Sequence, residues 1–532
     1  MLSFFCAFFL PHVSLLCKCT LFYRILLYLC ICFEYFVDYM EKIRKGPSFA
    51  VSVIPIVLLA VLLGIVITLK GADALDGGSQ FALILTSAVA AGLSMLLYGV
   101  RWEQLEGAIA KNIFSSSGSI LIFLFIGAIA GTWMISGVVP TLICYGLQIL
   151  HPSVFLVTAC VICAVVSIVT GSSWTTCATI GVALMGIGYS NGFPEWWTAG
   201  AVISGAYFGD KMSALSDTTV LASSTAKVPL FAHIRYMMYT TVPSFVLALT
   251  VYAIAGICLY DSNCTMSSEL VVALEGSFNI SPWLLLVPAF TFTLIAFKVP
   301  ALVTLFLSML SACVAMLIFQ PSLVAHIGGG EVLNFRTAVL GVMTSCCNST
   351  AIDTGHEVLN GLVATRGMAG ALNVIWLVLT AMCFGGVMVG SGMMGAITAT
   401  LLKGVKSVAG AVSATVFSGI FFNCCTGDQF MSIILACDLN KGSFDRLGVD
   451  RRVLSRATED SATVVSVLIP WNTCGVVQSM VLGVPTLAFA PFCFFNLISP
   501  LMSILVAKLN YRILRVGNEE SSVAYSSEKG NL

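Results

Sequence analysis

The sequence contains few charged residues. Only 9% of its 532 residues are Asp, Glu, Lys or Arg, whereas a soluble domain carries about 25%. Basic and acidic residues number 25 each, so no net charge attracts a nucleic acid and no acidic tail attracts a cationic partner. Hydrophobic residues make up 58% of the chain. Such a chain cannot hide its apolar surface from water, and we expect an integral membrane protein.

Signatures of pumps and metal sites are also missing. No G-x-x-x-x-G-K-[ST] loop occurs, which argues against an ATP-driven pump on this chain. The C-x-x-C at Cys160 and Cys163 has no second ligand pair or nearby histidine, so these thiols are expected to act as small apolar residues. We therefore expect no cofactor, no metal beyond a transported cation, and no enzymatic activity. Selectivity sequences of the kind that channels repeat are not visible either.

Long apolar runs dominate the rest of the chain. Runs of about 17–25 residues are long enough to cross the hydrocarbon core as helices. Other runs are interrupted by Gly, Ser, Thr, Asn or acidic residues. The sequence predicts an all-α integral membrane protein with 11–13 transmembrane helices, located in the inner or plasma membrane. Clear runs lie near 50–70, 79–100, 119–139, 152–170, 174–190, 236–259, 281–297, 300–319, 371–395, 407–425 and 491–508, and interrupted ones near 197–209, 337–352 and 462–487.

The two ends differ from the middle. Residues 1–39 precede Met40 and the sequence EKIRKG, which is how a cytoplasmic start often looks. The first 39 residues are therefore either an extra span or signal-like segment, or an artefact of start-site assignment. We expect a transporter domain over residues 40–514. Residues 515–532 are polar and rich in Ser and Glu, which predicts a disordered cytoplasmic tail.

The sharpest polar pattern within the apolar runs is residues 200–222, GAVISGAYFGDKMSALSDTTVLA. Asp210 and Asp217 are seven positions apart, so on one helix they would lie two turns apart on nearly the same face. One cavity could then reach both. A second interpretation stays open, in which Asp210 and Lys211 mark a helix end and Asp217 caps the next segment. Further oxygens in this stretch belong to Ser213, Ser216 and Thr218.

Carboxylates suit the exchange of a cation for a proton. An anionic oxygen binds either a proton or a hard cation such as sodium, and partial desolvation raises the pKa of a carboxyl group toward the working pH. Hydroxyls and the free carbonyls of unwound helices complete the shell of a hard ion. Residues 171–181 and 468–475 offer both, and we expect each to be a broken or kinked helix. Their candidate ligands are Ser172, Ser173, Thr175, Thr176, Asn472 and Thr473.

For each hydroxyl, the alternative is a hydrogen bond to its own or a neighbouring helix. Four further acidic residues are secondary candidates: Asp353, Asp428, Glu459 and Asp460. Arg456 lies three or four residues from the last two and could simply neutralise them. Asp353 is followed by Gly355, His356 and Glu357, which also fits the water-exposed end of a span.

The sequence also has a weak internal symmetry. Ser-Trp-Thr-Thr-Cys at 173–177 recurs as Pro-Trp-Asn-Thr-Cys at 470–474, and transporters are often built from two related halves. At these positions the chain resembles the NhaC family of sodium/proton antiporters, from roughly residue 50 to residue 510. The stretches that carry the resemblance are 127–147, 171–188, 203–219, 366–388, 427–433 and 454–475.

The resemblance implies two inverted repeats with broken helices and an ion site made by the acidic and hydroxyl residues named above. Expected partners are the sodium ion and the proton as substrates and the lipid bilayer, with no nucleic acid; a homodimer is left open. The chain departs from the family pattern at Ala214, Val220, Ala462 and Val467, where Pro, Asn, Gly and Pro are expected. A sodium- or proton-coupled exchanger of small carboxylates such as malate or lactate therefore remains the alternative.

Overall fold

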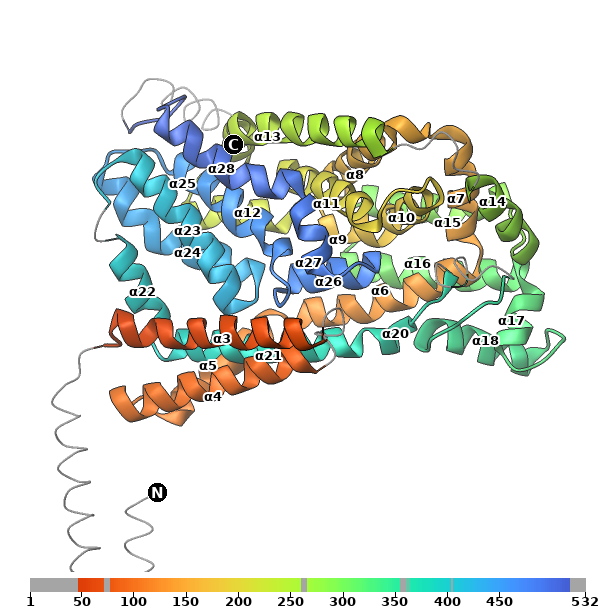
Figure 1. Ribbon diagram of the computed structural model, residues 1–532, viewed down its shortest axis with the longest axis horizontal. Helices are drawn as coiled ribbons and strands as arrows, with labels where there is room; N and C mark the ends of the chain where they lie inside the picture. The colour runs from red at the N-terminus through yellow and green to blue at the C-terminus, as the bar shows by residue number, and fades with distance from the viewer. Residues whose placement is uncertain are drawn as a thin grey trace, which may run out of the picture.

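The computed structural model describes residues 46–70, 77–259, 266–354, 360, 363–402 and 405–516. Over these residues the chain is almost entirely helical, and its only β pairings are two isolated bridges. The predicted all-α class is therefore confirmed (Figure 1). The proposed extension at 1–39 lies outside the described residues, as does the predicted tail except for residues 515 and 516. Arg515 forms a bridge with Val449.

Among the described residues, eight helical segments are long and apolar enough to cross a membrane, two of them counted together with the short helix that precedes each. Three further helix pairs, bent by 92°, 48° and 56° at a short break, raise the number to eleven if each pair is one span. That is the lower end of the predicted 11–13 spans. The eight are α3 (Phe49–Lys70), α4 (Gly78–Tyr98), α6 (Ser117–Ile135), α8 (Phe155–Thr170), α13 (Leu230–Leu259), α16 (Ala301–Phe319), α21 (Leu372–Gly390) and α23 (Val408–Thr426).

The bent pairs and the shorter helices complete the chain. Pairs are α14 (Met266–Ser277) with η4 and α15 (Pro282–Leu285, Leu286–Ala296), α25–η5–η6 (Arg451–Thr458, Glu459–Thr463, Ser466–Leu468) with α26 (Thr473–Leu482), and α27–η7 (Thr486–Phe489, Ala490–Phe492) with α28 (Phe494–Lys508). Others are α5 (Trp102–Ser115), α7 (Val138–Ile149), η2 (Pro152–Val154), α9 (Ser173–Thr176), η3 (Cys177–Gly181), α10 (Val182–Ser190), α11 (Glu195–Met212), α12 (Asp217–Ala226), α17 (Pro321–Ile327), α18 (Phe335–Cys347), α20 (Gly367–Gly370), α22 (Met393–Leu402) and α24 (Gln429–Arg446).

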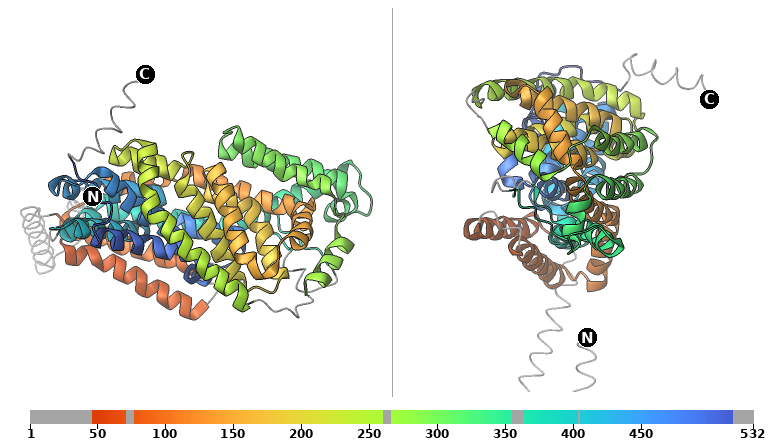
Figure 2. Two further views of the ribbon diagram at one scale, coloured as in Figure 1. Left: turned by 90° about the horizontal axis from the view of Figure 1, so that it is seen from above. Right: turned by 90° about the vertical axis from the view of Figure 1, so that its right-hand side faces the viewer.

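The helices are arranged around a central group of broken segments. In Figure 1, α3, α4, α5 and α21 lie together along the lower side, and α13 runs along the upper side. The short helices α9, α26 and α27 lie between them. Figure 2 shows the same bundle from above and from one end, and it is longer than it is wide. The broken segments are thus enclosed by continuous helices.

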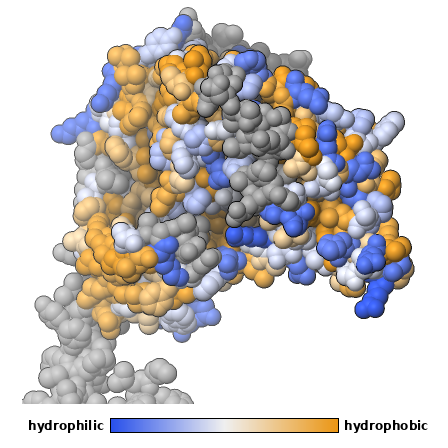
Figure 3. Space-filling view, turned by 45° about the vertical axis from the view of Figure 1, so that its right-hand side comes forward, coloured by the Kyte–Doolittle hydropathy of each residue, from blue (hydrophilic) through white to orange (hydrophobic). Residues whose placement is uncertain are grey.

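The outer surface is apolar over large areas, as Figure 3 shows for one face. Large apolar side chains on the long helices are turned outward; Leu96 is 74% exposed and Ile257 is 69% exposed. In water this would be a large unfavourable surface. It suits contact with lipid chains, where backbone polar groups must be satisfied within the helices. The composition and the surface therefore agree on a membrane protein.

Both segments predicted to be broken are broken. After α8, Gly171 adopts a left-handed conformation (φ 66°), α9 is one turn long, and η3 is a π-helix. In the other segment, the chain bends between Leu468, where η6 ends, and Thr473, where α26 begins. The π-helix η5 lies just before this segment. π-Helical turns leave backbone groups without their usual helical partners, and they occur frequently at functional sites.

The stretch with the two aspartates is not one continuous helix. α11 ends at Met212 and α12 begins at Asp217. The prediction that Asp210 and Asp217 lie two turns apart on one face of a single helix is therefore wrong. The interpretation with Asp210 and Lys211 at a helix end is correct. Ser216, rather than Asp217, caps α12, because its hydroxyl accepts a hydrogen bond from the Thr219 N–H. Short polar side chains at 213 and 216 favour such a break.

The close packing of α8 against α11 positions the aspartate end of α11. A Cβ atom at Gly205 or Gly209 would collide with the carbonyl oxygens of Cys160 and Ala164, respectively. In addition, the Ser167 hydroxyl of α8 donates to the Ala206 carbonyl at 2.6 Å. Small residues spaced by four allow two membrane helices to approach in this way.

We predict that Gly205→Ala lowers the free energy of unfolding by about 1–3 kcal/mol, because the added methyl forces the two helices apart. Thermal unfolding of the purified protein in detergent measures this. Gly92→Ala is the matched control: it lies on α4 with no atom within 4 Å of its added Cβ, so it should be neutral or slightly stabilising. Equal melting temperatures for the two variants would contradict the packing argument.

Candidate functional site

Asp210 lies at the end of α11, where it meets the start of α9. Its carboxylate oxygen Oδ2 accepts two hydrogen bonds from Ser173, one from the N–H at 3.2 Å and one from the hydroxyl at 2.7 Å. Ser173 is the first residue of α9, and the break after Gly171 directs its N–H toward α11. Asp210 is only 6% exposed. The two hydrogen bonds fix the position of this buried carboxylate among apolar surroundings.

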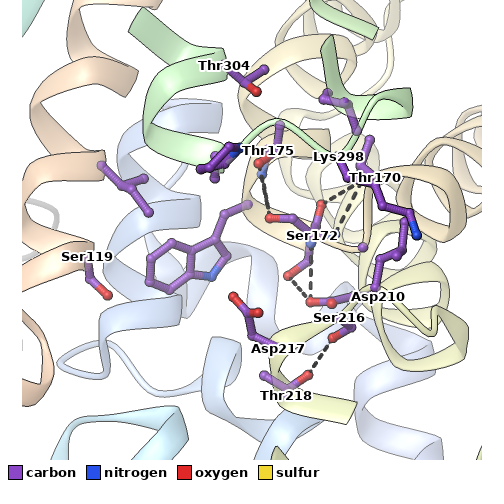
Figure 4. A pocket seen from close by; sticks show the side chains of 18 of the residues that line it. Ser119, Thr170, Ser172, Thr175, Asp210, Ser216, Asp217, Thr218, Lys298 and Thr304 are labelled. Atoms are coloured by element: carbon purple, nitrogen blue, oxygen red, sulfur yellow. Dashed lines mark hydrogen bonds between the residues drawn. The ribbon is translucent and has the colours of Figure 1, made fainter. Parts of the chain in front are cut away.

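A cavity of about 460 Å³ lies in front of this carboxylate. Asp210 and Asp217 both line it, so the expectation that one cavity reaches both is confirmed although the helix is broken. Asp217 is exposed, unlike Asp210. Figure 4 shows both carboxylates beside the hydroxyls of the cavity wall. Other polar residues lining the cavity are Ser119, Thr170, Ser172, Ser173, Thr175, Ser216, Thr218, Lys298, Thr304 and Gln429.

The hydroxyls of the α9 segment are partly engaged in local hydrogen bonds. Ser172 caps α9 and accepts from the Thr175 N–H at 3.2 Å and the Thr175 hydroxyl at 3.1 Å. Thr176 donates to the Ser172 carbonyl at 2.9 Å and pairs with Thr170 at 3.2 Å. Thr176 is fully buried and does not line the cavity. Of the predicted group in this segment, Ser172, Ser173 and Thr175 therefore reach the cavity.

Of the secondary candidates near α12, some line the cavity and one does not. Ser216 and Thr218 line the cavity, and their hydroxyls pair with each other at 2.9 Å. Ser213 does not line it, since its hydroxyl donates to the Ile168 carbonyl at 2.8 Å. That bond anchors the end of α11 to α8. Ser213 thus has a structural contact in this conformation.

Asn472 and Thr473 lie away from the cavity. Asn472 caps α26 by accepting from the Cys474 N–H at 3.1 Å, and it donates to the Asn423 side chain at 3.1 Å. The Thr473 N–H donates to the Gly427 carbonyl at 2.9 Å. α26 nevertheless packs against α9 and η3, so the two repeated motifs meet. The polar side chains of the two motifs nevertheless do not line the same cavity.

Side-chain amides satisfy the carbonyls released by the η5 break. Asn423 donates to the Ala462 carbonyl at 2.7 Å, Gln429 to Thr463 at 3.2 Å and Asn496 to Val464 at 2.8 Å. Buried carbonyls need such partners when the helix cannot supply them. Three amides from three other helices thus hold the irregular segment in place.

We predict that Asn423→Leu lowers the free energy of unfolding by about 1–3 kcal/mol, because the Ala462 carbonyl and the Asn472 amide both lose a buried partner. The melting temperature in detergent measures this. Phe417→Leu on the outer face of the same helix, where Phe417 is 59% exposed, is the control and should change it little. If Asn423→Leu is as stable as the unmodified protein, the hydrogen bonds from these side-chain amides do not stabilise the irregular segment.

Two other acidic candidates have structural contacts. Asp428 caps α24 by accepting from the Met431 N–H at 2.8 Å, and Ser116 donates to it at 3.3 Å. It is buried and lies next to Gln429, but it does not line the cavity. Asp353 is exposed in the connection after α18 and accepts from the Asn360 amide at 3.2 Å. That position fits the alternative of a span end exposed to water.

Asp460 forms a fully buried ion pair with Lys211. The same carboxylate oxygen accepts from Ser499 at 3.0 Å and from Thr240 at 3.2 Å. The alternative that Arg456 neutralises Asp460 is therefore wrong, because the partner is Lys211 at the end of α11. Arg456 instead lies over the Tyr236 ring, with its guanidinium carbon 4.6 Å from the ring centroid. The one available signal was a lysine beside Asp210 within an apolar run.

These features define a polytopic α-helical membrane protein whose broken spans surround a carboxylate-lined cavity. The profile of the Na+/H+ antiporter family matches residues 205–510. The chain is 33% identical over 462 residues to the malate-2H(+)/Na(+)-lactate antiporter of Bacillus subtilis, covering 86% of this chain and 94% of that protein. It is 33% identical to the Na(+)/H(+) antiporter NhaC of the same organism, over 79% of this chain and 90% of that protein.

A third relative is the Na(+)/H(+) antiporter NhaC of Alkalihalophilus pseudofirmus, which is 35% identical over 466 residues. The alignment covers 88% of this chain and 96% of that protein. The chain therefore belongs to the Na+/H+ antiporter family, as its resemblance predicted. The aligned regions span nearly the whole of each relative, so the likeness concerns the complete transporter fold.

Proposed function

We propose that the protein exchanges sodium ions for protons across the membrane by alternating access. The observation that carries this proposal is the Asp210 carboxylate, held by Ser173 at the junction of two broken helices and facing a polar cavity. Membership of the Na+/H+ antiporter family supports it. We further propose that the protein resides in the cell membrane, with residues 40–514 as the transport domain.

In this proposal, sodium binds between the two cavity carboxylates. Asp210 supplies a charge that is already oriented by two hydrogen bonds, and Asp217 supplies a second charge at the more exposed side. Hydroxyl oxygens of Ser172, Ser173 and Thr175 lie close enough to the cavity to replace water around a dehydrated ion. Hard cations prefer such oxygen ligands. The breaks flanking α9 and α12 are where the helices could bend to expose the site to the other side.

The test is a pH-gradient assay in vesicles that contain the purified protein. Sodium chloride added outside acidified vesicles should collapse the gradient, whereas choline chloride should not. Addition of potassium and lithium in parallel determines the cation preference. If sodium has no effect on the pH gradient while the protein remains folded and correctly inserted, the proposed exchange is wrong.

The second candidate function is exchange of small carboxylates coupled to sodium or protons. The cavity favours it in one respect: at about 460 Å³ it is much larger than a bare sodium ion, and Lys298 lies on its wall. One relative is a malate-2H(+)/Na(+)-lactate antiporter. Adding malate or lactate to the same vesicles distinguishes the two. Proton movement that needs the carboxylate, rather than sodium alone, would favour this second function.

A further inference from the structure

Glu459 is a buried carboxyl group without a hydrogen-bond partner. It lies at the first position of the π-helix η5 and is 0% exposed. Neither of its oxygens has a hydrogen-bond partner among the described residues. The Thr463 hydroxyl lies near enough to interact, but the two groups do not reach hydrogen-bonding geometry. A carboxylate anion buried without donors costs several kcal/mol, so this environment favours the neutral acid.

The neighbouring Asp460 is in the opposite situation. One of its oxygens receives the Lys211 ammonium, the Ser499 hydroxyl and the Thr240 hydroxyl. These donors stabilise the anion. Two adjacent carboxyl groups whose surroundings favour opposite protonation states can be assigned opposite roles. Asp460 therefore serves as the ion-pair partner of Lys211, and Glu459 is the group of the two that is left to carry a proton.

The charges around Glu459 come from α11 and from its own segment. Lys211 attracts a negative charge on Glu459, whereas Asp210 and Asp460 repel it. Arg456 is the other buried cation nearby, and no ion pair joins it to Glu459 in the described chain. The ionisable groups on the helices that pack against η5 are Asp217 on α12, Cys424 and Cys425 on α23, Cys437, Asp438, Lys441, Asp445 and Arg446 on α24, Arg451, Arg452 and Arg456 on α25, and Lys508 on α28.

We propose that Glu459 carries the proton of the exchange, at a site separate from the sodium site at Asp210; this inference rests on the proposed function. The two sites interact through charge. When Asp210 is empty and negative, it repels a negative charge on Glu459 and the proton stays bound. When sodium neutralises Asp210, that repulsion is cancelled and Lys211 favours the Glu459 anion. Sodium binding therefore releases the proton, and by linkage proton binding weakens sodium binding.

The step involves only a proton and no other reactant. Glu459 loses its proton to water, leaving a carboxylate, when the site is open to one side of the membrane. It takes a proton from water on the other side after sodium has left Asp210. Glu459 does not line the cavity and is fully buried in this conformation. In this proposal, the conformation described therefore corresponds to the protonated state of Glu459, before sodium has bound at Asp210.

The test is Glu459→Gln, which keeps the size of the side chain but cannot release a proton. In vesicles without a pH gradient and at saturating sodium, exchange of 22Na+ for unlabelled Na+ should remain within about threefold of the unmodified protein, whereas sodium-driven proton movement should fall at least about tenfold. Glu195→Gln, an exposed carboxyl on α11, is the matched control and should alter neither rate. Retained proton movement in Glu459→Gln overturns the inference, as does loss of sodium–sodium exchange in a folded variant.

A second variant covers the case in which Glu459→Gln does not fold. Glu459→Asp keeps an acid but shortens its side chain, which changes its distance to Lys211. The pH midpoint of sodium-driven proton movement should then shift, and an unchanged midpoint overturns the inference. Failure of the proposed function is distinguishable, because the unmodified protein itself would then show no sodium-driven proton movement. If that exchange is present and Glu459→Gln retains it, only this inference is wrong.

Discussion

Replacing Asp210 by Asn is expected to abolish sodium-dependent proton movement. Asp210 is the buried carboxylate of the cavity, and its Oδ2 accepts two hydrogen bonds from Ser173. A unit charge about 4 Å from a monovalent cation attracts it by about 4 kcal/mol at an effective dielectric constant of 20. Loss of that attraction lowers sodium affinity by about a thousandfold. Uptake of 22Na+ and the pH-gradient assay measure the effect in vesicles.

Two comparisons make this result specific. Asp438→Asn removes a carboxylate that is 49% exposed on α24 and should leave transport unchanged. Asp217→Asn removes the exposed carboxylate of the cavity, where water screens the charge more strongly. We expect it to raise the half-saturating sodium concentration by less than Asp210→Asn does. If Asp210→Asn retains normal exchange, Asp210 has no place in the mechanism.

Replacing Lys211 by Met is expected to cause the largest loss of stability. Lys211 and Asp460 are paired with both side chains fully buried. Removing the cation leaves a carboxylate buried with only the Thr240 and Ser499 hydroxyls as partners. Breaking a buried ion pair on one side destabilises a protein by about 3–5 kcal/mol. The thermal unfolding temperature in detergent and the yield of folded protein measure this.

The paired replacement tests the cause. Lys211→Met with Asp460→Leu removes both charges and leaves no isolated ion, so most of the lost stability should return, because apolar residues can replace a buried pair at little cost. Asp438→Asn, which breaks an exposed pair with Lys441, should change stability by less than about 1 kcal/mol. If the double variant is no more stable than Lys211→Met, the isolated charge is not the reason for the loss.

Much of the architecture could be predicted because it depends on local properties. Long apolar stretches such as α6 and α16 were identified from hydropathy, and the breaks at 171–181 and 468–475 from Gly, Pro and hydroxyl residues. α24 was not predicted, because its polar residues, including Asp438 and Lys441, hide the apolar pattern of a helix packed on one side. The arrangement as two inverted repeats remains a prediction.

The candidate site was predicted in part. Asp210, Asp217, Ser172, Ser173 and Thr175 were named from their sequence context, and they meet at one cavity. Asn472 and Thr473 were grouped with them by the repeated motif, but a motif does not determine the direction of a side chain. The roles of the predicted residues in ion binding are still proposals.

The sequence by itself determined that the chain lies in a lipid bilayer, that it is helical, and which side chains are chemically able to bind cations. Hydropathy and residue chemistry are properties of short segments. The tertiary structure decided which of those groups meet. Lys211 and Asp460 are 249 positions apart, and only helix packing brings them together. The same packing leaves Glu459 without a donor while its neighbour has three. Such differences arise from contacts between distant segments, which no local pattern specifies.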